Sequence, residues 1–392
     1  MVVNGHEAES RRDRPGAGWI GSESNDEERC SACILPRSTR ALGFNAQGEC
    51  QLCQRAKTAA VGRPASGASN VDLQKQIDEI KERGRGRPFD CVVGVSGGRD
   101  SSYLLYLLVH EHQLRCLAAY YRTPFTSEVT DANVRRMTTL LGVPLVEMNI
   151  SKHYHRRIAR DLVRVWNKRP NEVIANLACA PCKLVNREVF TIARDYKVRS
   201  IVFGVNRFEF MQFTAAQSRS ADIATARLFS LRETATQMLR IIGRGTGMLR
   251  RYPALFRYLP IGFQASVMYV SLHTPYLKLR YPEIHALEYF YYADWTETAC
   301  EAALAQLGWQ LPPGCNSTWK ADCSYAELKN CMFRRTVGAT YVDTFFSNMV
   351  REGVLSRDEA LDRLVTSGKV SQERLAETYR ILGLSEDERV AS

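Results

Sequence analysis

The feature that most constrains this chain is the run of residues 91–102. Residues 91–95 are apolar throughout, and apolar side chains resume at helical spacing from Tyr103. A glycine-containing turn separates the two stretches, and it reads Ser96, Gly97, Gly98, Arg99, Asp100, Ser101, Ser102. This pattern predicts a buried strand, a tight turn and the first turn of a helix.

The residue types in this turn suit an anion. Glycine lets the backbone approach a ligand closely, and the first helical turn has N–H groups without intrahelical partners. A phosphate chain is the predicted ligand, and a glycine turn without a ligand is the alternative. A Walker loop is excluded because no Gly-Lys-Ser/Thr follows, and a dinucleotide fingerprint because the third glycine is missing. The predicted binding residues are Ser96, Gly97, Gly98, Asp100, Ser101 and Ser102.

Strand-like and helix-like segments alternate after residue 89. The expected strands are residues 91–95, 115–119, 145–148 and 200–204, and the expected helices are residues 101–110, 129–141 and 182–196. This alternation predicts an α/β fold with a doubly wound parallel sheet and the phosphate loop at its C-terminal edge. Gly204 and Asn206 directly follow a strand there, and we expect them to contact nucleotide or substrate. Ordinary strand-end polarity is the alternative.

Composition divides the chain into five parts. They are a disordered leader (1–29), a zinc-ribbon-like module (30–53), a linker with a helix (54–88), the strand–helix domain (89–210) and a mostly helical insertion with the C-terminal substrate region (211–392).

The net charge of +11 over 392 residues suits an anionic partner such as tRNA, a nucleotide-sugar or ATP, although scattered surface charge is the commoner meaning. No signal peptide and no apolar run of membrane-spanning length is visible. We therefore expect a cytoplasmic protein, whose 12 cysteines serve as metal ligands, reactive thiols or core residues rather than disulfides.

Two pairs of cysteines lie close together near the N-terminus. Cys30 and Cys33 form one C-x-x-C knuckle, and Cys50 and Cys53 form a second. Each knuckle can present two thiolates to one tetrahedral ion, so this spacing predicts a structural Zn²⁺ site with no open position.

A second set comprises Cys179, Cys182 and, far downstream, Cys323. Three cysteines leave a fourth position open, as in a catalytic iron–sulfur cluster or a thiol-based sulfur carrier. The alternative is a knuckle or two buried thiols, with Cys323 unrelated to them.

The turn at residues 96–101 resembles the pyrophosphate loop of the N-type ATP pyrophosphatases, matching its Ser-Gly-Gly-x-Asp-Ser pattern at every fixed position. The resemblance implies that residues 89–210 form an ATP pyrophosphatase domain, like the adenine nucleotide alpha-hydrolases. It also implies that ATP is cleaved between its α- and β-phosphates and that AMP activates a carbonyl oxygen. Asp100 is then the candidate for placing Mg²⁺, and helix capping is its alternative role.

Three further stretches resemble the N-acetyl sugar amidotransferases, a branch of those enzymes that serves surface polysaccharide biosynthesis. They are residues 30–53, 316–323 and 328–360. The resemblance implies conversion of an acetamido group into an acetamidino group on an N-acetylated sugar, which can be nucleotide-linked. Ammonia would come from a separate glutaminase subunit, because this chain shows no glutaminase constellation.

Asp100, Lys320 and Cys323 are the predicted catalytic residues. Lys320 could hold a carboxylate or phosphate of the substrate, or it could be a surface lysine. A second hypothesis is a sulfur transferase that thiolates tRNA or a small molecule, with a 4Fe-4S cluster on the second cysteine set. A third is a non-catalytic nucleotide-binding scaffold.

Overall fold

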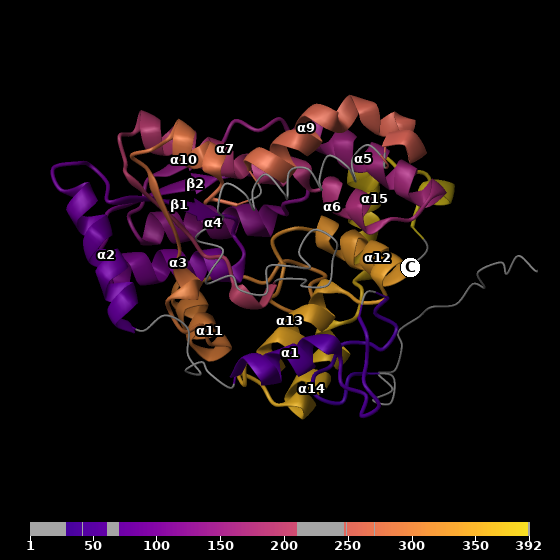
Figure 1. The fold of residues 1–392 in the computed structure, drawn as a ribbon. Helices are drawn as coiled ribbons and strands as arrows, with labels where there is room; N and C mark the ends of the chain where they lie inside the picture. The colour runs from indigo at the N-terminus through magenta and orange to yellow at the C-terminus, as the bar shows by residue number, and fades with distance from the viewer. Residues whose placement is uncertain are drawn as a thin grey trace, which may run out of the picture.

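A five-stranded parallel sheet forms the centre of the molecule, as the computed structural model shows (Figure 1). The structure describes residues 29–60 and 70–390, apart from residues 41, 210–246, 248 and 270. The strands lie in the order β3-β2-β1-β4-β5, and every neighbouring pair is parallel. They are β1 (Cys91–Val95), β2 (Cys116–Tyr120), β3 (Leu145–Glu147), β4 (Ser200–Phe203) and β5 (His285–Glu288). The predicted α/β class with a parallel sheet is confirmed.

Alternate residues of the strands enter two separate hydrophobic cores, because successive side chains of a strand point to opposite faces. Val92 of β1 belongs to one core, and its neighbours Cys91 and Val93 belong to the other. Helices therefore cover both faces, which is the doubly wound arrangement. The core of Cys91 and Val93 includes residues of α2 (Asn70–Gly84), α3 (Arg99–His110), α4 (Glu128–Leu140) and α11 (Glu297–Gln306), whereas α5 (Lys152–Lys168) and α7 (Ala180–Asp195) supply the core of Val92.

The strand order reverses direction between β1 and β4, and this is where ligands bind in open parallel sheets. The phosphate loop follows β1 directly and so lies at this position. Close packing here depends on Gly94, since a Cβ atom at that residue would stand 2.4 Å from the ring of Phe203 on β4.

The sheet is not completed within residues 89–210, because its fifth strand comes from His285–Glu288. The four expected strands are confirmed to within one residue at each end. The fifth was missed in a segment interpreted as mostly helical, since only one of its four residues is buried and no alternating pattern marks it. The leader, apart from Arg29, and much of the expected insertion lie outside the described residues.

The C-terminal helices form a layer against which the cysteine module packs (Figure 1). The main-chain N–H of Arg40 donates to Val337 O over 2.9 Å, and Gly338, with φ +82°, leaves room for Ser38 O, which a Cβ would clash with at 2.1 Å. The elements of this layer are α12 (Tyr325–Val337), α13 (Tyr341–Arg351), α14 (Arg357–Ser367) and α15 (Gln372–Leu382), and the module ends in α1 (Gln51–Ala60).

Shorter elements complete the described chain. They are α6 (Glu172–Leu177), α9 (Leu259–Phe263), α10 (Pro275–Arg280) and several single-turn helices, including Arg207–Glu209 after β4. Across the described residues, no helix is both long enough and apolar enough to span a bilayer.

Candidate functional site

The phosphate loop has a backbone that only glycine can supply at its centre. Gly97 has φ +82°, and a Cβ there would lie 2.7 to 2.9 Å from Thr130 and Val134 of α4. Gly98 is the N-cap of α3, and no side chain caps the helix. Hydroxyl groups hold the turn together: Ser102 Oγ donates to Gly98 O over 2.9 Å, and the Ser96 N–H donates to Ser101 Oγ over 3.1 Å. The helix N-terminus thus presents N–H donors beside a closely approachable backbone, which suits a phosphate chain.

The carboxylate of Asp100 is held by donors from three parts of the chain. Arg99 Nε and Trp295 Nε1 each donate to Oδ1 over 3.1 Å, and Asn206 Nδ2 donates to Oδ2 over 3.4 Å. Burial raises the pKa of Asp100, and the charge of Arg99 opposes part of that rise. Gly98, not Asp100, is the N-cap, so the capping role considered for Asp100 is wrong.

Asp322 brings a second carboxylate to the loop from the C-terminal region. A Cβ at Gly98 would lie 3.1 Å from Asp322 Cγ and 3.3 Å from its Oδ2. Asp322 and Asp100 both contribute to raising the pKa of Lys320, so the two carboxylates converge on one region. Carboxylate oxygens beside a phosphate site are what Mg²⁺ requires, and these residues fit it. The sequence had indicated only Asp100 for this role.

Lys320 lies in the same region as Asp100. Its Nζ is 2.7 Å from Glu209 Oε2, and its backbone has φ +49°, a strained value for a residue other than glycine. Burial lowers the pKa of Lys320, but Glu209, Asp322 and Asp100 more than offset this, so the pKa stands above its ordinary value. The side chain is therefore a cation at neutral pH.

Gly204 and Asn206, which follow β4, both lie against Asp100 of the phosphate loop. A Cβ at Gly204 would stand 3.1 Å from Asp100 O, so this glycine permits the close approach of β4's end to α3. Asn206 is 1% exposed and bonds Asp100. The structure therefore brings Asp100, Gly204, Asn206 and Lys320 together.

Arg99 occupies the variable position of the loop, and its buried side chain bonds other protein groups, the Asp100 carboxylate among them. Its side chain is 4% exposed and lies over the Trp295 ring, 4.7 Å from the centroid. Its Nη1 donates to Glu297 Oε1 over 3.1 Å and to Thr318 Oγ1 over 3.0 Å. Arg99 thus connects α3 to α11 and to the segment that carries Lys320 and Asp322.

A small polar hollow, with room for about one water molecule, adjoins Lys320. Three further cationic side chains line it, and Arg374 among them is 5% exposed with a buried Nε that has no hydrogen-bond partner among the described residues. Positive charge predominates there, which suits an acidic group on a substrate. The basic lining residues are Lys320, Arg334, Lys369 and Arg374.

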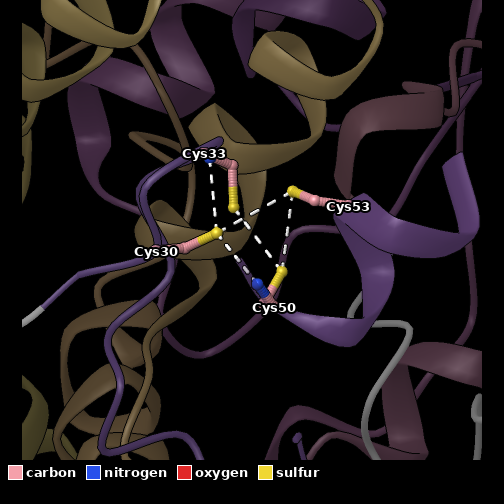
Figure 2. Close-up of side chains that lie close together, drawn as sticks. All are labelled: Cys30, Cys33, Cys50 and Cys53. Atoms are coloured by element: carbon pink, nitrogen blue, oxygen red, sulfur yellow. Dashed lines mark hydrogen bonds between the residues drawn. The ribbon is translucent and has the colours of Figure 1, made fainter. Parts of the chain in front are cut away.

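The four N-terminal cysteines converge as a metal site would require (Figure 2). Their sulfurs lie 3.9 Å apart for Cys30 and Cys53, 3.8 Å for Cys33 and Cys50, and 3.6 Å for Cys50 and Cys53. Four thiolates about 2.3 Å from a tetrahedral zinc would be about 3.8 Å from one another. The main-chain N–H of Cys50 also donates to Cys30 Sγ over 3.2 Å. These residues fit a closed, structural zinc.

The second cysteine set has a different arrangement. Among the residues that the structure describes, only the N-terminal four place all their ligand atoms within 4.8 Å of one another, so Cys179, Cys182 and Cys323 do not form a compact single-ion site. Burial is the main cause of the raised pKa of Cys182. Cys179 and Cys323 lie close enough to raise it further. Burial also raises the pKa of Cys323 to about 12. Both thiols are therefore neutral at neutral pH in the absence of a metal.

His155 lies beside the second cysteine set, and the sequence pattern did not predict it as a site residue. Its Nε2 lies 3.8 Å from Cys182 Sγ, and its Nδ1 lies 3.0 Å from Tyr121 OH. Burial lowers the pKa of His155 to about 4, so the ring is neutral. Nothing in its sequence neighbourhood, within a run of basic residues, distinguishes it from a surface histidine.

No model of a known protein family and no curated protein sequence matches this chain. Three solved structures show a distant likeness. NMN synthetase from Francisella tularensis is 14% identical, covers 81% of this chain and 94% of its own, and has a TM-score of 0.33. An NH3-dependent NAD synthetase from Campylobacter jejuni is 13% identical, covers 51% of this chain and 95% of its own, and has a TM-score of 0.25. A tRNA thiolase from Methanococcus maripaludis with its 4Fe-4S cluster is 12% identical, covers 92% of this chain and 89% of its own, and has a TM-score of 0.29. These scores are too low for any of the three to bear on this chain's activity, ligands or partners.

Proposed function

We propose that this chain is an AMP-forming enzyme of the N-type ATP pyrophosphatase kind. The observation that supports this most is the position of the Ser-Gly-Gly-x-Asp-Ser loop. It lies between β1 and α3, at the point where the strand order reverses, with the Asp100 carboxylate oriented by Arg99, Trp295 and Asn206. A turn without a ligand would need neither the oriented carboxylate nor the second one at Asp322.

In the proposed reaction the loop N–H groups and serine hydroxyls bind the β- and γ-phosphates of ATP. An amide carbonyl oxygen of the acceptor attacks the α-phosphorus, and pyrophosphate leaves. Mg²⁺, held by Asp100 and Asp322, would offset the charge of the pyrophosphate. Lys320, a cation beside both carboxylates, stabilises negative charge that develops on the phosphates.

The second half of the reaction replaces the activated oxygen. Ammonia attacks the adenylated carbon, and AMP departs with the former carbonyl oxygen, so an acetamido group becomes an acetamidino group. We propose an N-acetylated sugar as acceptor, and the basic side chains that gather near Lys320 support one that carries an acidic group, such as a carboxylate or a nucleotide diphosphate. A separate glutaminase subunit as the ammonia source, and a role in surface polysaccharide biosynthesis, belong to this proposal.

A direct test is to incubate the protein with ATP, Mg²⁺, ¹⁵N-ammonium and a panel of N-acetylated sugars, both free and nucleotide-linked. We expect AMP and pyrophosphate in a one-to-one ratio and ¹⁵N in one sugar product. ADP and inorganic phosphate as products would contradict the proposal. Asp100→Asn should abolish AMP formation, whereas Asp358→Asn, in the first turn of α14, should not change it.

The second cysteine set, with His155 beside Cys182, favours a second candidate, a sulfur transferase that retains the adenylation step. Cys323 comes from a distant segment and yet, like Cys179, raises the pKa of Cys182, so the fold brings these thiols into one region. A 4Fe-4S cluster with tRNA or a small molecule as acceptor would fit this arrangement. Sulfide-dependent, rather than ammonia-dependent, AMP formation by anaerobically purified protein would favour this candidate.

A further inference from the structure

A continuous path of hydrogen bonds leads from the four-cysteine site to the phosphate loop. It begins at Arg351, the last residue of α13, whose Nη1 donates to Cys33 Sγ over 3.3 Å. Its Nη2 donates to Asn348 Oδ1, three residues earlier on the same helix face. The guanidinium is therefore shared between a metal-ligand sulfur and an asparagine, a geometry that a lysine ammonium cannot reproduce.

Asn348 links Arg351 to the segment that follows β4. It is 3% exposed, and its Nδ2 donates to Phe208 O over 2.7 Å. The Phe208 N–H donates in turn to Asn206 Oδ1 over 3.1 Å, and Asn206 Nδ2 reaches Asp100 Oδ2. Each group in this path is oriented by its neighbour, so a change at Cys33 can reach the Asp100 carboxylate.

Aromatic packing supports the same segment from α13. The Phe208 ring, 1% exposed, lies edge-on to Phe345 of α13 at 6.2 Å and to Trp295 at 6.3 Å. Trp295 is itself a donor to Asp100. Since Phe345 and Asn348 both contact Phe208 from one helix, α13 controls how the 206–209 segment lies.

We propose that Arg351 and Asn348 are positioning residues that couple the metal-loaded cysteine module to the 206–209 segment, so that metal loading at Cys33 orders the segment that holds Asp100 and Lys320. A metal-bound thiolate keeps a fixed position and accepts a charge-assisted hydrogen bond from the guanidinium. Without the metal, coordination no longer fixes the Cys33 sulfur, so Arg351 and then Asn348 are held less firmly in the positions from which they reach Cys33 and Phe208. For its effect on catalysis this inference rests on the proposed function, but the ordering of the segment does not.

The test uses the full, zinc-loaded chain and measures amide hydrogen exchange in peptides covering residues 204–209. We expect Arg351→Met to retain zinc and to speed exchange there by about tenfold, the value of one lost buried hydrogen bond. Asn348→Asp should do the same, because it keeps an acceptor for Arg351 but removes the donor to Phe208 O. Arg357→Gln is the matched control, since Arg357 donates to the main-chain oxygens of Cys30 and Cys33.

Unchanged exchange at residues 204–209 in Asn348→Asp would overturn the proposal, as would an equal increase in Arg357→Gln. If Arg351→Met loses zinc, Asn348→Asp still decides, because it leaves the cysteine module untouched. In AMP formation, both positioning variants should lower kcat by about tenfold, with KM for ATP changed less. If the wild-type protein forms no AMP, the proposed function fails while the exchange result still decides the coupling.

Discussion

The two cysteine sets use the same C-x-x-C spacing and arrive at different sites. In the N-terminal set, two knuckles from one short module bring four sulfurs within 4.8 Å of one another. In the second, Cys179 is the N-cap of α7 and Cys182 lies in its first turn, whereas the third cysteine, Cys323, comes from a distant segment. Both sets therefore contain a C-x-x-C pair. They differ in whether the remaining cysteines come from the same short module or from a distant segment.

The surroundings of the two sets differ as well. Around the first, main-chain N–H groups and Arg351 donate to the sulfurs, which stabilises thiolates bound to a metal. Around the second, burial raises the pKa of Cys182, and a neutral His155 is its neighbour. The first environment suits a permanent cation and the second does not require one.

The largest expected effect separates the two sets directly. Cys53→Ser should release the zinc and lower the free energy of unfolding by more than about 3 kcal/mol, because metal binding and folding of the module are one event. Metal analysis and denaturant unfolding measure both effects. Cys331→Ser, a buried thiol of α12, is the control and should keep its zinc. Retained zinc and stability in Cys53→Ser would contradict a four-cysteine site.

The next effect tests whether ATP binding is independent of both cysteine sets. Gly97→Ala combines a positive φ with a clash against Thr130, so Mg²⁺-ATP affinity should fall by more than about tenfold while zinc content is unchanged. Calorimetric titration measures the affinity. Gly86→Ala is the matched control, because Gly86 has φ +71° but no atom of the described residues lies within 4 Å of its added Cβ. Equal losses in the two variants would mean that backbone strain, not the shape of the phosphate loop, governs binding.

A smaller effect is expected from the second cysteine set. Cys182→Ser should leave zinc content unchanged and alter ammonia-dependent AMP formation by less than about threefold, because no step of the proposed amidotransferase reaction uses this thiol. Steady-state assays with ammonia and with sulfide compare the two functions. A complete loss of turnover with zinc intact would support the sulfur-transfer candidate instead.

The smallest expected effect is a shift in pH dependence. The Asp100 carboxylate is required in its charged form, burial raises its pKa, and Arg99 opposes that rise, so activity falls as pH drops through the raised pKa. Arg99→Gln should move the acid limb of AMP formation to higher pH, because the charge that opposes the raised pKa of Asp100 is removed. Arg363→Gln removes the other guanidinium on Glu297 without touching Asp100, and its profile should match the wild type. An acid limb that moves to lower pH would contradict the assigned role of Arg99.

Local pattern predicted the glycine turn between β1 and α3 and the convergence of the four N-terminal cysteines, because each is built from residues close in sequence. The glycines at residues 97 and 98 and the two cysteine knuckles carry their geometry with them. The central strands β1 and β2 were also marked by apolar runs, since both faces of the sheet are covered there.

Sequence could not predict the contacts that tertiary folding creates. Asp322 reaches Gly98 from the C-terminal region, and Arg99 bonds Glu297 and Thr318 and lies over the Trp295 ring. The distance between the second cysteine set's members is equally a matter of chain packing. Sites assembled from distant segments therefore remained hypotheses until the fold was known.

The most direct test of this comparison is the metal content and visible absorbance of anaerobically purified wild-type protein and of a variant with Cys179, Cys182 and Cys323 all replaced by Ser. The account predicts about one zinc per chain in both proteins and no iron absorbance in either. A brown wild-type protein with about four irons per chain, lost in the triple variant, would contradict it and assign the second set to a cluster.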